Sequence, residues 1–105
     1  MAANLMLTYK LKPGVSPADF ENWVRTTDYP AMRGLKRVRS FTTYRATGLL
    51  MGEGSPLMDY MEVFEIPDFA GFMQEDMASP TVQNIMGQFM GFAEAPQFVL
   101  VDEVR

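Results

Sequence analysis

The stretch MDYMEVFEIPDFAGFMQEDM, residues 58–77, decides the fold because its hydrophobic period changes in the middle. Over residues 58–66 the side chains alternate between two faces, as in a strand with one buried face. Over residues 69–77 the apolar side chains recur three and four positions apart, which predicts one face of a helix. Pro67 stands at the change, and Asp68 is placed to cap the helix. The stretch therefore predicts a strand that runs directly into a helix.

Two other stretches alternate in the same way and predict strands over residues 4–12 and 38–46, and a stretch rich in valine, leucine and phenylalanine predicts a strand over residues 97–104. With the strand of residues 58–66 and the intervening helices, the order of elements is β-α-β-β-α-(α)-β. Two βαβ-type units with right-handed crossovers predict an α+β, ferredoxin-like fold, in which a four-stranded antiparallel sheet carries helices on one face. The length of 105 residues predicts a single domain over residues 1–105.

The helices have recognisable starts and ends in the sequence. Ser16-Pro17 and Ser79-Pro80 each place a serine at the N-cap and a proline in the first turn. Pro30 is expected to break or kink the first of these helices, with room for one further turn before Gly34. The last helix is expected to end by Pro96.

The composition excludes several classes of function. The chain has no cysteine and no histidine, so it lacks a thiol nucleophile and the commonest ligands of zinc and haem. Acid–base chemistry must therefore fall to Glu, Asp, Tyr or Lys. The net charge of −4 argues against a nucleic-acid or anionic-membrane partner. With no signal-like segment and no apolar stretch long enough to cross a membrane, a cytoplasmic protein is expected.

The second face of the predicted sheet is also partly apolar. Helices can cover only one face, and under either register the other carries apolar residues such as Met6, Phe41, Val63, Val99 and Val101. An apolar sheet face must be buried against something. A second copy packed sheet to sheet about a two-fold axis is the simplest cover, so we expect a homodimer.

Four stretches resemble the dimeric α+β barrel superfamily, which includes antibiotic-biosynthesis monooxygenases, EthD-like proteins and Dabb proteins. They are ANLMLTYKLKPGVS (residues 3–16), DFENWVRTTDYPAMR (19–33), VRSFTTYRATG (38–48) and DYMEVFEIPDFAGFMQEDMASPTVQ (59–83). Within it they are most similar to the RedY-like proteins of prodiginine biosynthesis, which makes red tripyrrole pigments. The resemblance implies a sheet-to-sheet dimer that binds a pyrrolic or polyketide-like intermediate. It also implies a condensation or cyclisation with loss of water in the bipyrrole branch, without a cofactor.

Glu62 is the sharpest catalytic candidate, because it shares a strand face with aromatic residues. An apolar cleft raises the pKa of a carboxyl group, which suits a general acid or base near neutral pH. Tyr44 is the second catalytic candidate, as a hydrogen-bond donor to a carbonyl oxygen. The substrate-binding candidates are Tyr9, Trp23, Ser40, Thr42 and Tyr60. The alternative for Glu62 is an ion pair with Arg39 or Arg45 on a neighbouring strand.

Two further positions have more than one interpretation. Trp23 is more often a core anchor than a substrate platform, because Phe20 and Val24 already give it an apolar helical stripe. Asp28-Tyr29 precedes the expected helix break and is expected to be solvated, with a place at the mouth of a pocket as the alternative.

Three functions remain open. The first is acid–base assistance, centred on Glu62, to the cyclisation and dehydration of a pyrrolic intermediate. The second is a cofactor-independent monooxygenase of aromatic natural products, for which Asn22, Trp23 and Arg45 supply the residue types associated with such enzymes. The third is a non-catalytic carrier or chaperone dimer for an unstable intermediate.

Overall fold

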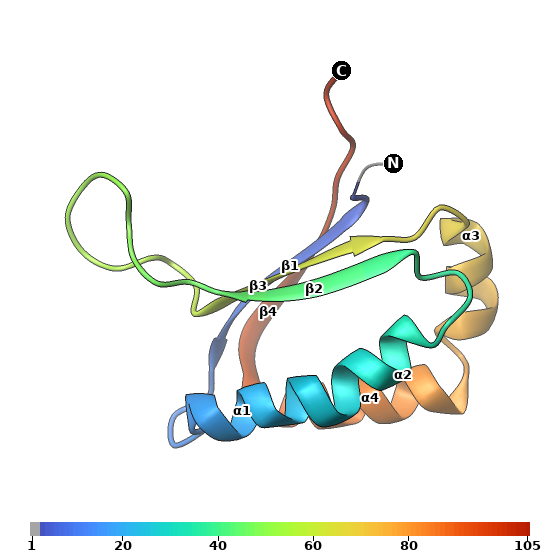
Figure 1. Cartoon of the computed structure of the whole chain (residues 1–105), viewed down its shortest axis with the longest axis horizontal. Helices are drawn as coiled ribbons and strands as arrows, with labels where there is room; N and C mark the ends of the chain where they lie inside the picture. The colour runs from blue at the N-terminus through green and yellow to red at the C-terminus, as the bar shows by residue number, and fades with distance from the viewer. Residues whose placement is uncertain (1–2) are drawn as a thin grey trace.

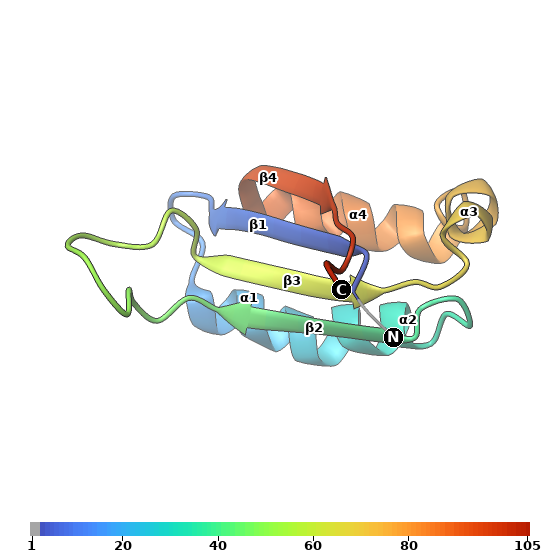
Figure 2. The ribbon, with the colours of Figure 1, turned by 90° about the horizontal axis from the view of Figure 1, so that it is seen from above.

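The structure is a computed structural model that describes residues 3–105. Within these residues the chain forms one four-stranded antiparallel sheet, in the order β2-β3-β1-β4. The strands are β1 (Leu5–Leu11), β2 (Ser40–Arg45), β3 (Tyr60–Glu65) and β4 (Ala93–Leu100). The helical segments of residues 17–33 and 80–92 lie on one side of the sheet, and that of residues 69–76 lies beyond its end (Figures 1 and 2). The predicted α+β, ferredoxin-like arrangement is confirmed.

The stretch of residues 58–77 folds as its period predicts. Alternate residues of β3 are buried, and Ile66, just beyond its end, is fully buried. Asp68 caps the next helix by accepting a hydrogen bond of 3.0 Å from the backbone N–H of Gly71. The Asn4 side chain pairs with both backbone polar groups of Ile66, at 2.7 and 2.9 Å. The exit of β3 is thereby tied to the start of β1.

Two of the helical paths contain a π-helical turn. The segments are α1 (Pro17–Trp23), η1 (Val24–Asp28), α2 (Tyr29–Arg33), α3 (Phe69–Gly71), η2 (Phe72–Asp76) and α4 (Pro80–Phe92). In η1 the backbone N–H of Tyr29 donates to the carbonyl of Val24, five residues earlier. Because this wide turn precedes Pro30, the proline stands in the first turn of α2 and the helical path continues to Arg33.

The last strand begins four residues earlier than predicted. Helix α4 ends at Phe92, and Pro96 lies inside β4 rather than before it. A proline is tolerated in β4 because this strand is at the edge of the sheet. The pairing with β1 also shifts between Thr8 and Lys10, and nearby Ala95 has a φ of 50°. Such irregularities bend an edge strand and allow it to follow directly from a helix.

The register of β2 is the second correction. Thr43 pairs with Glu62 and Phe41 pairs with Phe64, so the odd-numbered residues of β2 face the helices. Phe41 was predicted on the outer face, but its ring stacks on that of Phe64 with centroids 4.2 Å apart. Ser40, Thr42 and Tyr44 were predicted to face the helices, and this is wrong because they pair with Glu65, Val63 and Met61 on the outer face.

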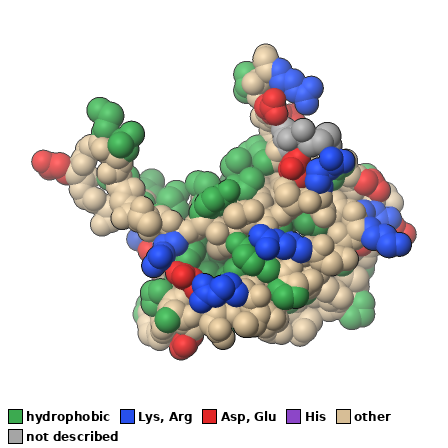
Figure 3. Space-filling model, in the orientation of Figure 1, with side chains coloured by type: hydrophobic (Ala, Val, Ile, Leu, Met, Phe, Trp, Pro, Cys, Tyr) green, Lys and Arg blue, Asp and Glu red, His purple; other side chains and the backbone are tan. Residues whose placement is uncertain are grey.

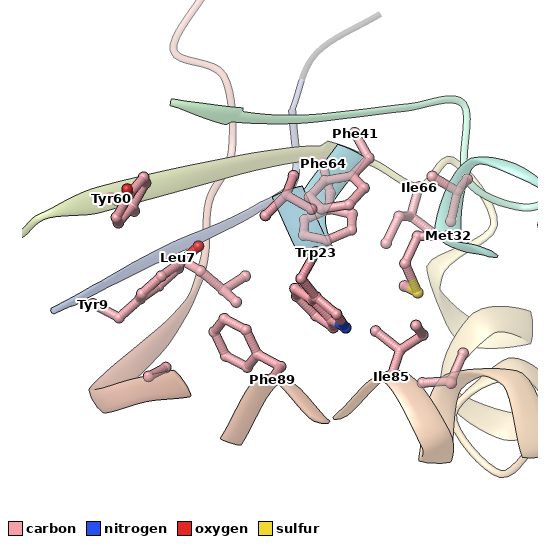
Figure 4. Close-up of a cluster of buried hydrophobic side chains, with 14 of the residues drawn as sticks. Leu7, Tyr9, Trp23, Met32, Phe41, Tyr60, Phe64, Ile66, Ile85 and Phe89 are labelled. Carbon is pink, nitrogen blue, oxygen red and sulfur yellow. The ribbon is translucent and has the colours of Figure 1, made fainter. Parts of the chain in front are cut away.

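The core between the sheet and the helices is rich in aromatic rings (Figure 4). Phe20 is fully buried and contacts Tyr9, Trp23, Tyr60 and Phe92. The Trp23 indole N–H donates to the Gln88 side chain at 2.7 Å, which anchors helix α1 to helix α4. Within residues 3–105, no helix combines the length and apolar character needed to cross a membrane.

Ile66→Ala tests whether the junction after β3 holds the fold. We expect a loss of about 2–5 kcal/mol in the free energy of unfolding, because a fully buried aliphatic side chain is replaced by a cavity. The control Leu50→Ala removes a side chain of the same size that is 99% exposed, and it should change the value by less than about 0.5 kcal/mol. Urea unfolding of both variants gives the comparison. Equal losses would show that the junction has no special role.

Candidate functional site

A cavity of about 560 Å³ lies between the sheet and the helices, at the end of the molecule that holds α2, α3 and η2. This volume is within the range of about 300–1,000 Å³ that is usual for small-molecule sites. Its walls are phenylalanine, leucine, isoleucine, valine and methionine side chains, among them Met32, Met73, Met77, Met86 and Met90. Asp28 and Glu62 are the polar exceptions among the lining residues. The cavity therefore fits a largely apolar ligand with a few polar groups.

Glu62 comes from the middle of β3 and is 3% exposed. The Tyr9 hydroxyl, on the neighbouring strand β1, donates a hydrogen bond of 2.5 Å to Glu62 Oε2. Burial raises the pKa of Glu62 to about 8; the bond from Tyr9 opposes this rise, and the charge of Asp28 adds to it. Since Tyr9 binds only Oε2, Oε1 is left for a ligand.

Asp28 is the second buried carboxyl of the cavity, also 3% exposed. Burial raises its pKa to about 7, against the opposing effect of the Arg33 charge. The prediction that it is a solvated loop residue is wrong, because the helix does not end there. The signal that could have found it is a spacing of four: Phe20, Val24, Asp28 and Met32 are all buried. Such a spacing is wider than the α-helical period and fits a path with a π turn.

The two predicted tyrosines of β1 and β3 are not among the residues that line the cavity. Tyr9 is buried and reaches the site through its hydrogen bond to Glu62. The Tyr60 ring stacks on Tyr9 with centroids 5.9 Å apart, and its hydroxyl donates to Glu21 at 2.7 Å. Burial raises the pKa of both tyrosines above the ordinary value, so both hydroxyls stay protonated.

The remaining predicted residues do not meet Glu62 in the cavity. Tyr44 is 55% exposed on the outer face of the sheet, and Thr42 lies on that face beside it. The Ser40 hydroxyl donates to Glu65 Oε1 at 3.0 Å, on that same outer face. Trp23 belongs to the core. Their expected place in the pocket is wrong because the register of β2 differs by one residue, and because Trp23 packs against α4.

The alternative ion pair of Glu62 is not formed. Arg45 binds Glu21 at 3.5 Å, and Arg39 is exposed at the start of β2. Within residues 3–105, no ion pair involves Glu62 or Asp28. The same part of the chain has no group of three acidic side chains placed to hold a metal ion.

The wall formed by η2 is fixed from outside the cavity. Arg37, in the segment between α2 and β2, binds Asp68 at 3.2 Å, Asp76 at 3.1 Å and also Glu75. The three carboxylates flank or belong to the helical path α3–η2. These ion pairs connect the helical path α3–η2 to the segment between α2 and β2.

Comparisons with known proteins agree with this architecture. The sequence profile of the family described as REDY-like protein HapK matches residues 3–104. The chain belongs to the HapK family of REDY-like proteins. The crystal structure of HapK from Hahella chejuensis superposes with a TM-score of 0.75 at 25% identity, over 96% of this chain and 92% of that one. The resemblance expected from the sequence is confirmed.

Other solved structures share the fold of this HapK-family chain. An EthD family protein from Bacillus halodurans has a TM-score of 0.74 at 21% identity, covering 99% of this chain and 100% of its own. A dimeric ferredoxin-like protein of unknown function from Thermobifida fusca has a TM-score of 0.68 at 13% identity, covering 96% of this chain and 92% of its own. At these identities the likeness shows the fold alone. Among the curated proteins compared, none matches the sequence.

The buried carboxyls predict an unusual dependence of stability on pH. The pKa of Glu62 is about 8 in the folded protein against an ordinary value of 4.5, so the folded state holds a proton that the unfolded chain releases. Its contribution is complete below about pH 4.5 and is lost as the pH rises to about 8. The contribution of Asp28 to stability is lost in the same direction, as the pH rises from 3.8 to about 7. We expect the free energy of unfolding to fall over this range, by about 1.4 kcal/mol for each unit of pKa difference.

Urea unfolding at a series of pH values measures this slope. Glu62→Gln should reduce the slope, and it should make the protein more stable than the wild type at about pH 8. Glu21→Gln is the matched control, because Glu21 also accepts a bond from a tyrosine but lies outside the cavity. A slope that is unchanged by Glu62→Gln would contradict the buried, protonated carboxyl.

Proposed function

We propose that this protein binds a pyrrole-containing intermediate in its cavity and assists the condensation or cyclisation of that intermediate, with loss of water, in prodiginine-type pigment biosynthesis. The observation that carries the proposal is the Glu62 carboxyl, which faces an apolar cavity and is hydrogen-bonded by Tyr9. Membership of the REDY-like family supports the choice of pathway.

The walls of the cavity suit flat heteroaromatic rings. Phe64, Phe72 and Phe89 offer ring faces and edges, and the flexible methionines can adapt to the ligand outline. A pyrrole N–H is a hydrogen-bond donor that must be satisfied when it is buried, and carboxylates are acceptors. A pyrrolic ligand therefore matches both the apolar walls and the acidic polar groups.

The chemistry of ring closure matches the protonation state of Glu62. When an amine attacks a ketone, the C–N bond forms and the C=O electron pair moves to oxygen, which must then receive a proton. With a pKa of about 8, Glu62 is largely protonated at neutral pH and can supply that proton from Oε1. Tyr9 holds the carboxyl in place through Oε2.

The monooxygenase alternative gains no support from this site. Asn22 is exposed, Trp23 is in the core, and the Arg45 side chain is 62% exposed beside Glu21. None of the three lines the cavity. A carrier function would use the same cavity, so it is separated from catalysis by measurement of turnover.

Glu62→Gln separates catalysis from carriage. A suitable probe reaction is the closure of 4-amino-1-(pyrrol-2-yl)butan-1-one to the cyclic imine, started by a pH jump from the ammonium form and followed in a stopped-flow instrument. We expect the wild type to accelerate closure and Glu62→Gln to lose about 10²–10⁴-fold of that acceleration, as is usual for loss of a general acid. Binding of 2,2′-bipyrrole should remain within about threefold, because the amide keeps the shape of the carboxyl.

Two results would change the assignment. If the wild type binds 2,2′-bipyrrole without accelerating closure, the protein is a carrier. If neither the wild type nor Glu62→Gln binds 2,2′-bipyrrole, the proposed pyrrolic ligand is wrong.

We also propose that the protein works as a homodimer packed through the outer face of the sheet. Met6 pairs with Val63 and Val99 across three neighbouring strands, so these apolar side chains form one patch. In Figure 3 hydrophobic side chains line the hollow between the projecting loop and the C-terminal segment, on the side opposite the helices. A structural neighbour from Thermobifida fusca is described as dimeric.

Val63→Glu tests the dimer. Sedimentation equilibrium should give about twice the chain mass of 11.9 kDa for the wild type and the single-chain mass for the variant. A charge placed in an apolar interface is left without a partner, which opposes association. Asn84→Glu, on the exposed side of α4, is the control and should remain dimeric. A monomeric wild type at all concentrations would refute the proposal.

A further inference from the structure

We propose that Asp28 is a second catalytic carboxyl of the cavity, acting as the general base toward the same substrate to which Glu62 acts as the general acid. The inference rests on the function proposed above and adds a residue and a division of roles to it. It starts from the placement of the two carboxyls.

Asp28 and Glu62 reach the cavity from opposite layers of the domain. Asp28 comes from η1 in the helical layer, and Glu62 comes from β3 in the sheet. All other lining residues are apolar, and each carboxyl is 3% exposed. A ligand held between the layers therefore meets one carboxyl from the helices and one from the sheet.

The backbone has a local feature that places Asp28 inside. The π turn of η1 inserts an extra residue, and Asp28 is buried while its neighbour Thr27 is only partly so. Single π-helical turns weaken a helix and are frequent at functional sites. A carboxyl without an ion pair also costs stability in an apolar core. Two unfavourable features at one residue are the pattern expected where a side chain serves a ligand or a reaction rather than the fold.

The groups around each carboxyl divide their roles. Glu62 faces Tyr9 and Asp28; the Tyr9 hydroxyl occupies Oε2, so a proton on Glu62 is carried by Oε1. The charge of Asp28 acts on both Glu62 and Tyr9, and the charge of Arg33 favours the ionised form of Asp28 itself.

Arg33 is itself fixed from two sides. It donates to the Phe41 carbonyl at 2.9 Å and lies 3.6 Å over the Tyr29 ring. The Arg33 charge favours the ionised form of Asp28, and the charge of Asp28 in turn raises the pKa of Glu62, so Asp28 loses its proton first and Glu62 keeps its own.

This state can complete the condensation and return to its starting point. In the first step the amine nitrogen attacks the carbonyl carbon, Glu62 gives a proton to the oxygen, and Asp28 takes a proton from the nitrogen. In the carbinolamine that results, nitrogen and oxygen are bound to one carbon. Asp28 then protonates the hydroxyl, the C–O bond breaks and water leaves. Glu62 takes the remaining N–H proton, which gives the imine and restores both carboxyls without any oxidant or reductant.

The pH dependence of the probe cyclisation tests this division of roles. For the wild type, the catalysed rate should rise with the ionisation of Asp28 near pH 7 and fall with that of Glu62 near pH 8. Asp28→Asn should lose the rise at low pH and about 10²–10³-fold in rate, as for removal of a general base. Glu62→Gln should lose the fall at high pH. Glu21→Gln should keep both limbs.

A second variant tests the role of Asp28 if Asp28→Asn folds poorly. Arg33→Gln leaves both carboxyls in place but removes the cation near Asp28, so the low-pH limb should move to higher pH while the high-pH limb stays. A wild-type rate and profile in Asp28→Asn, together with loss of activity in Glu62→Gln, would overturn the role of Asp28 and leave the proposed function intact. Absence of any acceleration by the wild type would overturn the proposed catalysis itself.

Discussion

The rest of the structure depends on keeping a carboxyl in the middle of the sheet without a cation beside it. Glu62 alternates with Tyr60 and Phe64 on the helix-facing side of β3, so the strand cannot bury those rings without burying the carboxyl. The single hydrogen bond from Tyr9 satisfies one oxygen and links the two central strands, β1 and β3, at a fixed register. A slip of one residue would move every side chain of a strand to the other face. The same contact therefore fixes the sheet and aims the other carboxyl oxygen into the cavity.

The sequence was sufficient for the fold where one face of an element differs clearly from the other. In β1, leucines and Tyr9 share one face, and in β3 the aromatic side chains do, so the hydrophobic pattern determines which side faces the helices. In β2 each face holds one aromatic ring and at least one threonine, with Tyr44 and Thr42 on one face and Phe41 and Thr43 on the other, and the pattern could not choose between them. The pairing of Thr43 with Glu62 resolved the choice, and it moved Tyr44 out of the predicted pocket. Such a choice comes from tertiary pairing rather than from local sequence.

The candidate site was predictable in the sheet and not in the helices. Glu62 stood out because a strand has a strict period of two, which places a carboxyl on a face with no ambiguity. The helical path does not have a strict period, since η1 adds a residue to one turn. The break expected at Pro30 placed Asp28 near a helix end, whereas the spacing of four from Phe20 to Met32 places it in the core. Tyr9 was predicted as a ligand contact but acts on the site through Glu62.

Two π turns contribute to the wall of the cavity. Both η1 and η2 border it, the first through Asp28 and the second through Phe72 and Met73. Single π turns inside α-helices are frequent at functional sites, and here two of them border the same cavity. Arg37 and its three carboxylates link the path α3–η2 to the segment between α2 and β2 on the outside of the domain. The domain gives up packing energy and carboxyl hydration at one end of its core. This loss of stability is intelligible if the space has to admit a ligand and expose it to groups that exchange protons near neutral pH.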